Sequence, residues 1–138
     1  MLSREFEMRV WYVDTDQMGI VHHSNYIRYY EAARSDLMRD LGVSYAEMES
    51  RGVMMPILEV HSAYHASAHF DEMIRVEVTL RELPKARITF YYKIYSERGE
   101  LLNTGSTVLG FLNSQTRRPT RAPRWFTELL EQNWKEER

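Results

Sequence analysis

The chain has 138 residues, of which 43% are hydrophobic and 28% charged, and this is the composition of a globular domain that we expect to span residues 1–138. It contains no cysteine, which excludes a disulfide framework, a thiol nucleophile and a thiolate metal site. The net charge of −2 argues against general nucleic-acid binding, and no stretch resembles a signal peptide or a membrane span. The expected location is therefore the cytoplasm.

The first predicted strand covers residues 4–13 and ends in the β-branched and aromatic run VWYV. Two acids, Asp14 and Asp16, follow this strand, and Gly19 permits a tight turn in the loop beyond them. A long helix is predicted over residues 24–41. An acid at a strand end, a few residues before a helix N-terminus, places a base or nucleophile beside backbone N–H groups that polarise a carbonyl.

The long helix has clear start and stop signals. Ser24 and Asn25 are both good N-cap residues, and Gly42 ends the helix. Between them apolar residues recur at helical spacing, which predicts one buried stripe. The stripe consists of Tyr26, Ile27, Tyr30, Ala33, Leu37 and Leu41.

Short elements make up the rest of the chain. Ser44 begins a second, short helix, because Glu47 stands three residues later in capping-box position. Alternating apolar and polar residues then predict antiparallel strands. We expect these strands at residues 53–66, 73–82, 87–97 and 101–112, and a short amphipathic helix from Arg124 to about Trp134.

This order of elements predicts the α+β class, with one five-stranded antiparallel sheet wrapped around one long central helix. A single helix cannot cover both faces of a sheet, and an edge strand exposes unpaired backbone groups. A lone domain of this kind leaves apolar surface in water, so we expect it to dimerise.

Residues 14–34, which read DTDQMGIVHHSNYIRYYEAAR, match a long signature of mixed residue types, DTDxxGxVxHxxYxxxxExAR. In this signature the chain resembles the hotdog-fold acyl-CoA thioesterases, in particular their 4-hydroxybenzoyl-CoA thioesterase and YbgC-like branch. The resemblance covers the chain to about Pro123. It implies the hotdog fold, dimers or pairs of dimers with active sites between subunits, and no metal or other cofactor.

The resemblance also assigns roles to residues. Asp16 matches the catalytic carboxylate, a general base or nucleophile, whereas Asp14 is expected to be structural, as a turn former or a loop brace. His23 matches the residue whose backbone N–H holds the thioester oxygen, and its side chain is a further catalytic candidate. Tyr26 and Tyr30 are expected to line or pack the acyl pocket.

Basic residues are candidates for binding the phosphate groups of coenzyme A. Lys85 and Arg87 lie at a predicted turn, where related thioesterases carry such residues, and Arg117 and Arg118 lie in the late polar loop. For any one of them a solvated loop position is the alternative interpretation.

Other patterns have simpler interpretations. Glu31 and Arg34, three residues apart, are expected to form a supporting ion pair on the helix. His61, His65 and His69 have the spacing of a helical zinc site, but their segment is predicted as a strand, which separates consecutive members by about 13 Å. A metal site is therefore not expected.

The predicted activity is hydrolysis of an acyl-CoA thioester to a carboxylic acid and coenzyme A. One alternative is a hydratase or dehydratase of the same fold, which the DTD signature disfavours. The others are a non-catalytic acyl-CoA-binding or assembly module and a thioesterase that acts on acyl carrier protein.

Overall fold

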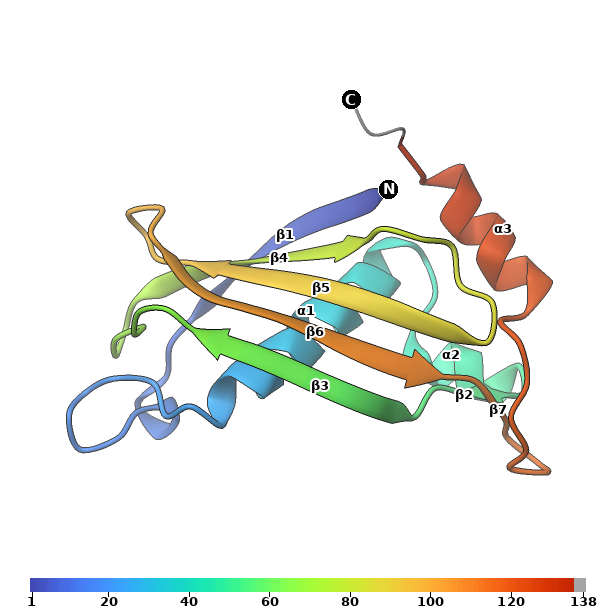
Figure 1. Ribbon diagram of the computed structural model, residues 1–138, viewed down its shortest axis with the longest axis horizontal. Coiled ribbons are helices and arrows are strands. Elements are labelled where there is room, and N and C mark those ends of the chain that lie inside the picture. Colours follow the sequence, from blue (N-terminus) through green and yellow to red (C-terminus); the bar gives the residue numbers. More distant parts are fainter. Residues whose placement is uncertain (136–138) are drawn as a thin grey trace.

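The computed structural model describes residues 1–135 and consists of a five-stranded antiparallel sheet with a long helix against one face (Figure 1). The strand order is β1-β4-β5-β6-β3. The strands are β1 (Leu2–Arg9), β3 (Ile57–Tyr64), β4 (Met73–Leu80), β5 (Arg87–Tyr95) and β6 (Leu101–Gly110). The helices are α1 (Asn25–Asp40), α2 (Tyr45–Ser50) and α3 (Arg124–Gln132), and the short strands β2 (Val53–Met54) and β7 (Leu112–Asn113) pair with each other. The predicted α+β architecture is confirmed.

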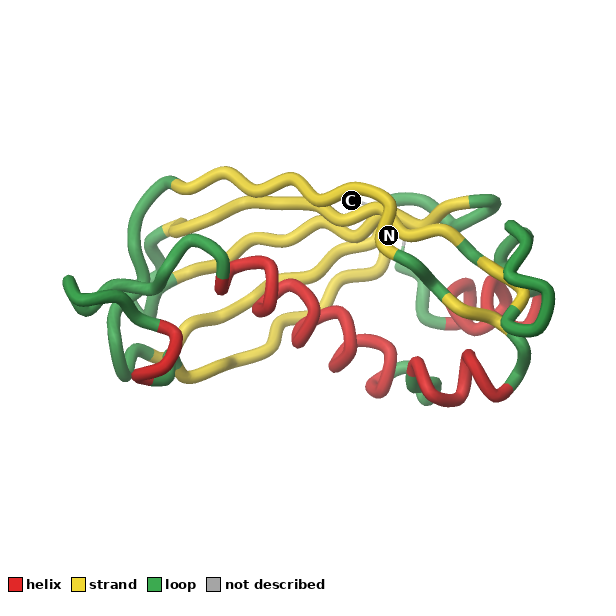
Figure 2. The backbone as a smooth tube through the Cα atoms, turned by 90° about the horizontal axis from the view of Figure 1, so that it is seen from below, coloured by secondary structure: helices red, strands yellow, loops and turns green. Residues whose placement is uncertain are grey.

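Figure 2 shows α1 lying against one face of the sheet. The hydrophobic core lies between the two. Strands β4 and β5 alternate buried and more exposed residues, and their buried members face the helix. From α1, Tyr30 stacks on Tyr92 of β5 with the ring centroids 4.3 Å apart. Burial of these apolar side chains is the main force that holds the helix on the sheet.

The prediction of the first strand was wrong at its end. β1 stops at Arg9, and residues 12–14 form a single 3-10 turn instead of continuing the strand. Trp11, Tyr12 and Val13 are all strongly exposed. These β-forming residues do not continue the strand, because the chain leaves the sheet at Val10. The Val10 carbonyl accepts a hydrogen bond of 3.0 Å from the Asp71 N–H at this point.

The expected strand over residues 53–66 is in fact two strands. Val53 and Met54 pair with β7, outside the main sheet, and the chain enters the sheet again at Ile57. Pro56 lies in the break, where its missing N–H cannot serve a ladder.

Two expectations for α1 also need correction. Ile27 is 43% exposed and so does not belong to the buried stripe. Arg34 makes no ion pair with Glu31; its buried guanidinium donates to the Tyr45 hydroxyl at 2.9 Å and to the Tyr92 hydroxyl at 3.1 Å. The fixed fork of the guanidinium therefore joins α1 to α2 and to the sheet.

The sequence signal for the start of α2 gave the expected local structure. Ser44 caps α2 by accepting a hydrogen bond of 3.1 Å from the Glu47 N–H, as the capping box predicts. Within residues 1–135, no helix has the length and apolar character required to cross a membrane.

Candidate active site

Asp16 lies at the start of a tight turn between the 3-10 turn and α1. Its backbone N–H donates to the Ile20 carbonyl at 2.9 Å, and its own carbonyl accepts from the Gly19 N–H at 3.0 Å. Gly19 has φ +77°, a conformation that favours glycine. One carboxylate oxygen of Asp16 accepts from the Met18 N–H at 2.8 Å, and the side chain is otherwise exposed. The turn thus presents a carboxylate to solvent with most of its acceptor capacity free.

This carboxylate borders a cavity of about 320 Å³. The lining residues come from the loop, from the start of α1 and from the end of β3. They are Asp16, Ile20, Val21, His22, His23, Tyr26, Tyr64, His65, Ala66 and Ser67. Three predicted site residues, Asp16, His23 and Tyr26, therefore share one cavity. A larger hollow of about 900 Å³ lies on the opposite face of the sheet and contains none of them, so we place the candidate site in the smaller cavity.

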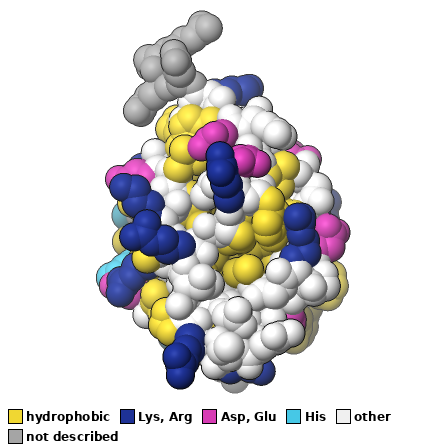
Figure 3. Space-filling view, turned by 90° about the vertical axis from the view of Figure 1, so that its right-hand side faces the viewer, with side chains coloured by type: hydrophobic (Ala, Val, Ile, Leu, Met, Phe, Trp, Pro, Cys, Tyr) yellow, Lys and Arg dark blue, Asp and Glu magenta, His cyan; other side chains and the backbone are white. Residues whose placement is uncertain are grey.

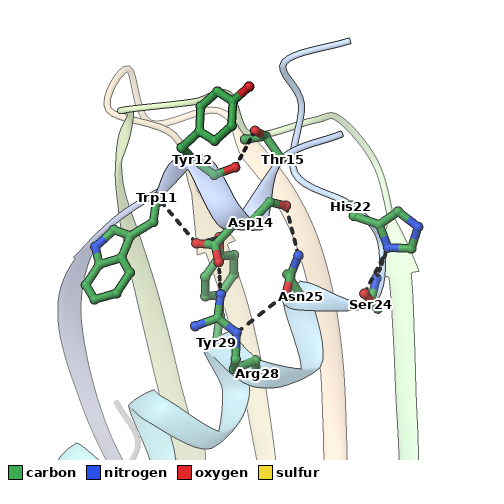
Figure 4. A network of polar contacts seen from close by, with 9 residues as sticks. All are labelled: Trp11, Tyr12, Asp14, Thr15, His22, Ser24, Asn25, Arg28 and Tyr29. Carbon is green, nitrogen blue, oxygen red and sulfur yellow. Dashed lines mark hydrogen bonds and ion pairs between the residues drawn. The ribbon is translucent and has the colours of Figure 1, made fainter. Parts of the chain in front are cut away.

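The N-terminus of α1 opens toward this cavity without a side-chain cap. Ser24 occupies the N-cap position, but its hydroxyl bonds His22 Nδ1 at 2.8 Å instead of a backbone N–H of the helix. Asn25, the other predicted cap, donates from Nδ2 to the Asp14 carbonyl at 2.8 Å (Figure 4). The positive end of the helix dipole is thus left available to a ligand.

The backbone N–H of His23 has no hydrogen-bond acceptor among residues 1–135. The carbonyl of the same residue accepts from the Tyr64 hydroxyl at 2.9 Å, which limits how the turn rotates. A free N–H at a helix start, held in place by a neighbouring strand, is suited to bind an oxygen that gains negative charge.

Two tyrosines of α1 have different positions. The Tyr26 ring meets the Tyr64 ring edge-on, with the ring centroids 5.3 Å apart, and the Tyr26 hydroxyl accepts from the Ala68 N–H at 3.1 Å. Burial raises the pKa of Tyr26, and the hydrogen bond from Ala68 partly opposes this shift. Tyr30 is fully buried and bonds Ser62 and Asn103, and burial raises its pKa to about 12. Tyr30 therefore packs beneath the sheet and does not line the cavity, whereas Tyr26 does.

Tyr64 and His65 are site residues that the sequence interpretation did not assign. Both lie where β3 ends, and His65 Nε2 lies 2.9 Å from the Thr104 hydroxyl. The available signal was their place at a strand end, which only the sheet topology connects with the loop before α1.

The predicted phosphate-binding residues lie at the other end of the sheet from Asp16 (Figure 1). Lys85 lies in the β4–β5 turn and Arg87 is the first residue of β5. Nine-residue β5 separates them from the Asp16 end of the sheet by about 26 Å. Arg117 and Arg118 follow β7 at that same end. Figure 3, which faces this end, shows Lys and Arg side chains interspersed with hydrophobic ones. These four residues therefore lie far from a thioester held beside Asp16.

Within the described part of the chain, residues 1–135, no three His, Asp, Glu or Cys side chains are grouped as a metal site requires. His61 lies in β3 with Nε2 3.5 Å from Glu59 Oε1, and His69 lies in the following loop with Nδ1 3.8 Å from Glu72 Oε1.

Comparison with known proteins places the chain among thioesterases. The family model described as "Thioesterase-like superfamily" matches residues 10–130. YneP of Bacillus subtilis (strain 168) is 37% identical over 95 residues, which are 69% of each chain. The acyl-CoA thioesterase YbgC of Helicobacter pylori is 29% identical over 130 residues, 88% of this chain and 96% of that one. The DHNA-CoA thioesterase from Staphylococcus aureus superposes with a TM-score of 0.86 and 34% identity, over 95% of this chain and 88% of that one.

Proposed function

The chain belongs to the thioesterase-like superfamily, and on this basis we propose that it hydrolyses an acyl-CoA thioester to a free carboxylic acid and coenzyme A. The observation that supports this proposal best is the cavity that Asp16 shares with His23, whose backbone N–H has no acceptor within residues 1–135. A carboxylate and an oxyanion donor in one cavity are the two groups that thioester hydrolysis requires.

In the proposed reaction the thioester oxygen accepts a hydrogen bond from the His23 N–H. Asp16 removes a proton from a water molecule, and the resulting hydroxide adds to the carbonyl carbon. The negative charge that develops on the oxygen is stabilised by the N–H and the helix dipole. The carbon–sulfur bond then breaks, and the thiolate of coenzyme A leaves and takes up a proton.

Asp16 has a second possible role as the nucleophile. Its carboxylate oxygen then adds to the carbonyl carbon, the thiolate leaves, and water hydrolyses the resulting anhydride. The exposure of Asp16 is compatible with both routes. Hydrolysis in ¹⁸O-water under single-turnover conditions separates them, because only the nucleophilic route places the label in Asp16.

We further propose a homodimer in which two β3 strands pair edge to edge. β3 is an edge strand, and four of its apolar side chains are exposed: Ile57 (46%), Leu58 (47%), Val60 (37%) and Tyr64 (49%). An edge of this kind invites strand pairing. A homotetramer made from two such dimers is the larger assembly compatible with this contact.

This dimer gives the distant basic residues a role. Antiparallel pairing about the middle of β3 brings the start of one strand beside the end of the other. The basic end of one protomer then approaches the Asp16 cavity of its partner. We therefore propose that Lys85, Arg87, Arg117 and Arg118 bind the phosphates of a coenzyme A whose thioester lies in the partner's cavity, since charge-assisted contacts suit phosphate.

Thiol release from a panel of acyl-CoAs tests the proposed activity. The panel contains acetyl, decanoyl, palmitoyl and 4-hydroxybenzoyl thioesters, and a chromogenic thiol reagent reports coenzyme A. Turnover of at least one thioester is expected. Absence of turnover on every member contradicts the coenzyme A proposal and favours either an acyl-carrier-protein thioesterase or a non-catalytic acyl-CoA-binding module.

A further inference from the structure

We propose that Asp14, the first acid of the DTD sequence, is a positioning residue that fixes the reacting carboxylate and the oxyanion donor relative to each other. This inference rests on the proposed function, because it assumes the roles given there to Asp16 and His23. Figure 4 shows that Asp14 lies at the centre of a polar network that joins the loop to α1.

The Asp14 carboxylate holds the body of the helix. Its Oδ1 accepts from the Arg28 guanidinium, and its Oδ2 accepts from the Tyr29 hydroxyl at 2.9 Å and from the Trp11 N–H at 3.1 Å. Asp14 is only 2% exposed. A buried carboxylate with three donors, one of them charged, has strong and directional contacts. The first turn of α1 is thus tied to the place where the chain leaves β1.

The Asp14 carbonyl holds the turn that precedes the helix. It accepts from the His22 N–H at 2.9 Å and from Asn25 Nδ2 at 2.8 Å. These two donors stand on either side of His23 in the chain. The orientation of the free His23 N–H is therefore set by the same residue whose carboxylate grips the helix.

Asp14 also determines where Asp16 lies. Only Thr15 separates the two acids, and Thr15 forms an antiparallel bridge with Val21 on the other side of the turn. The Thr15 N–H and hydroxyl both bond the Tyr12 carbonyl, at 3.0 and 2.7 Å. Asp16 and His23 thus extend from opposite sides of a turn that Asp14 anchors. Because reaction rates fall steeply when reacting groups are displaced by about 1 Å, weakening the contacts of Asp14 should lower turnover.

The chemistry of the network suggests how to disturb it without removing it. All three partners of the carboxylate are donors, so both oxygens of Asp14 must accept. In Asp14→Asn one oxygen becomes an NH₂ group, which then faces a donor. The substitution keeps the shape of the side chain and breaks part of the hydrogen-bond network around it. Arg28→Met is a second variant that is safer for folding, because the Arg28 side chain is half exposed.

The experiment compares the two variants and Arg28→Lys with wild type. It measures kcat and KM on one acyl-CoA, the affinity for its non-hydrolysable thioether, and hydrogen–deuterium exchange of residues 16–24. Arg39→Met is the matched control, because Arg39 makes an ion pair of 2.7 Å with Asp36 on the same helix, away from the cavity. Urea unfolding confirms that each variant is folded under the assay conditions.

We expect kcat to fall about 10- to 100-fold in Asp14→Asn and Arg28→Met, with KM and thioether affinity nearly unchanged. Exchange in residues 16–24 should rise in both variants, Arg28→Lys should recover part of kcat, and Arg39→Met should behave like wild type. Wild-type kcat in folded variants, or a parallel loss of kcat and thioether affinity, overturns the positioning role. If wild type hydrolyses no acyl-CoA, the proposed function fails. Unchanged hydrogen–deuterium exchange in the variants separately contradicts the proposal that Asp14 holds residues 16–24 in place.

Discussion

Asp14 and Asp16 stand two positions apart in the chain, yet their carboxylates have opposite surroundings. The Asp14 carboxylate is buried and accepts from three donors, whereas the Asp16 carboxylate is exposed and, within residues 1–135, accepts from the Met18 N–H alone. A carboxylate saturated with donors serves as an anchor, and one with free lone pairs can approach a water molecule or a carbonyl carbon. The difference in hydrogen bonding separates the supporting acid from the reacting one.

The buried Tyr30 limits the stability of the fold at alkaline pH. Burial, the largest cause, raises its pKa from 10.0 to about 12, although the bonds with Ser62 and Asn103 act in the opposite direction. Above pH 10.0 the unfolded tyrosine loses its proton while the folded one keeps it. Its contribution to folding is therefore complete below that pH and is lost as the pH rises toward 12.

We expect the urea midpoint of unfolding to decline between about pH 10 and about pH 12, and to decline less in Tyr30→Phe, which has no phenolic proton. The phenylalanine ring can keep the stack on Tyr92. Identical pH dependence in the variant and wild type would contradict this origin of the alkaline limit.

At the scale of elements, the distance between α1 and the sheet depends on a glycine of β6. A Cβ on Gly105 would meet the Tyr30 hydroxyl, the ring carbon that bears it at 2.5 Å and the His61 carbonyl oxygen at 2.7 Å. The last of these is backbone, which cannot rotate away. Glycine at this position allows α1 to approach the sheet closely enough for Tyr30 to reach Ser62 and Asn103.

Gly105→Ala should therefore lower the free energy of unfolding by about 1 to 3 kcal/mol, as overpacking of a well-filled core does. Gly110→Ala, in the same strand, is the matched control, because its Cβ would first meet the flexible Leu58 side chain at 3.2 Å. Urea unfolding of both variants measures the difference. Equal stability of the two would mean that α1 shifts without cost.

At the scale of the whole molecule, the two edges of the sheet differ. The β3 edge exposes Ile57, Leu58, Val60 and Tyr64 beside Glu59 and His61, whereas the exposed positions of β1 are all charged: Glu5, Glu7 and Arg9. Charged side chains protect an edge strand, and apolar ones leave it open to pairing. We therefore expect the proposed dimer to form at β3.

Val60→Lys tests this contact by placing a charge in the middle of the β3 edge. We expect the variant to sediment as a monomer and to lose most of its thioesterase activity, because the basic residues of the partner no longer reach the substrate. Glu7→Lys, on the β1 edge, is the control and should retain both the dimer and the activity. A Val60→Lys variant that remains dimeric would place the interface elsewhere.

Local and periodic features of the fold were predictable from the sequence. The alternation in residues 73–80 and 87–95, the spacing along α1 and the capping box at Ser44 depend on neighbouring residues alone. The strand end at Arg9 and the break at Met55 and Pro56 were not, because tertiary pairing decides them.

The same distinction applies to the site. Asp16, His23 and Tyr26 lie close together in the chain, and the family signature includes all three. Tyr64 and His65 reach the same cavity only through the antiparallel pairing of β3 with β6. For Asp14 the sequence predicted a structural role but not its network of contacts, because the donors belong to three separate segments of the chain.

The role of Asp16 as the reacting carboxylate is tested most directly by the turnover of Asp16→Asn on an acyl-CoA that wild type hydrolyses. Asparagine keeps the size of the side chain and cannot act as a base or as a carboxylate nucleophile. We predict that kcat falls by about 10²- to 10⁴-fold while the affinity for the thioether analogue stays within about twofold. Asp36→Asn, on the exposed face of α1, is the control. Near-wild-type turnover in Asp16→Asn would show that another group carries out the chemistry and would contradict the role proposed for Asp16.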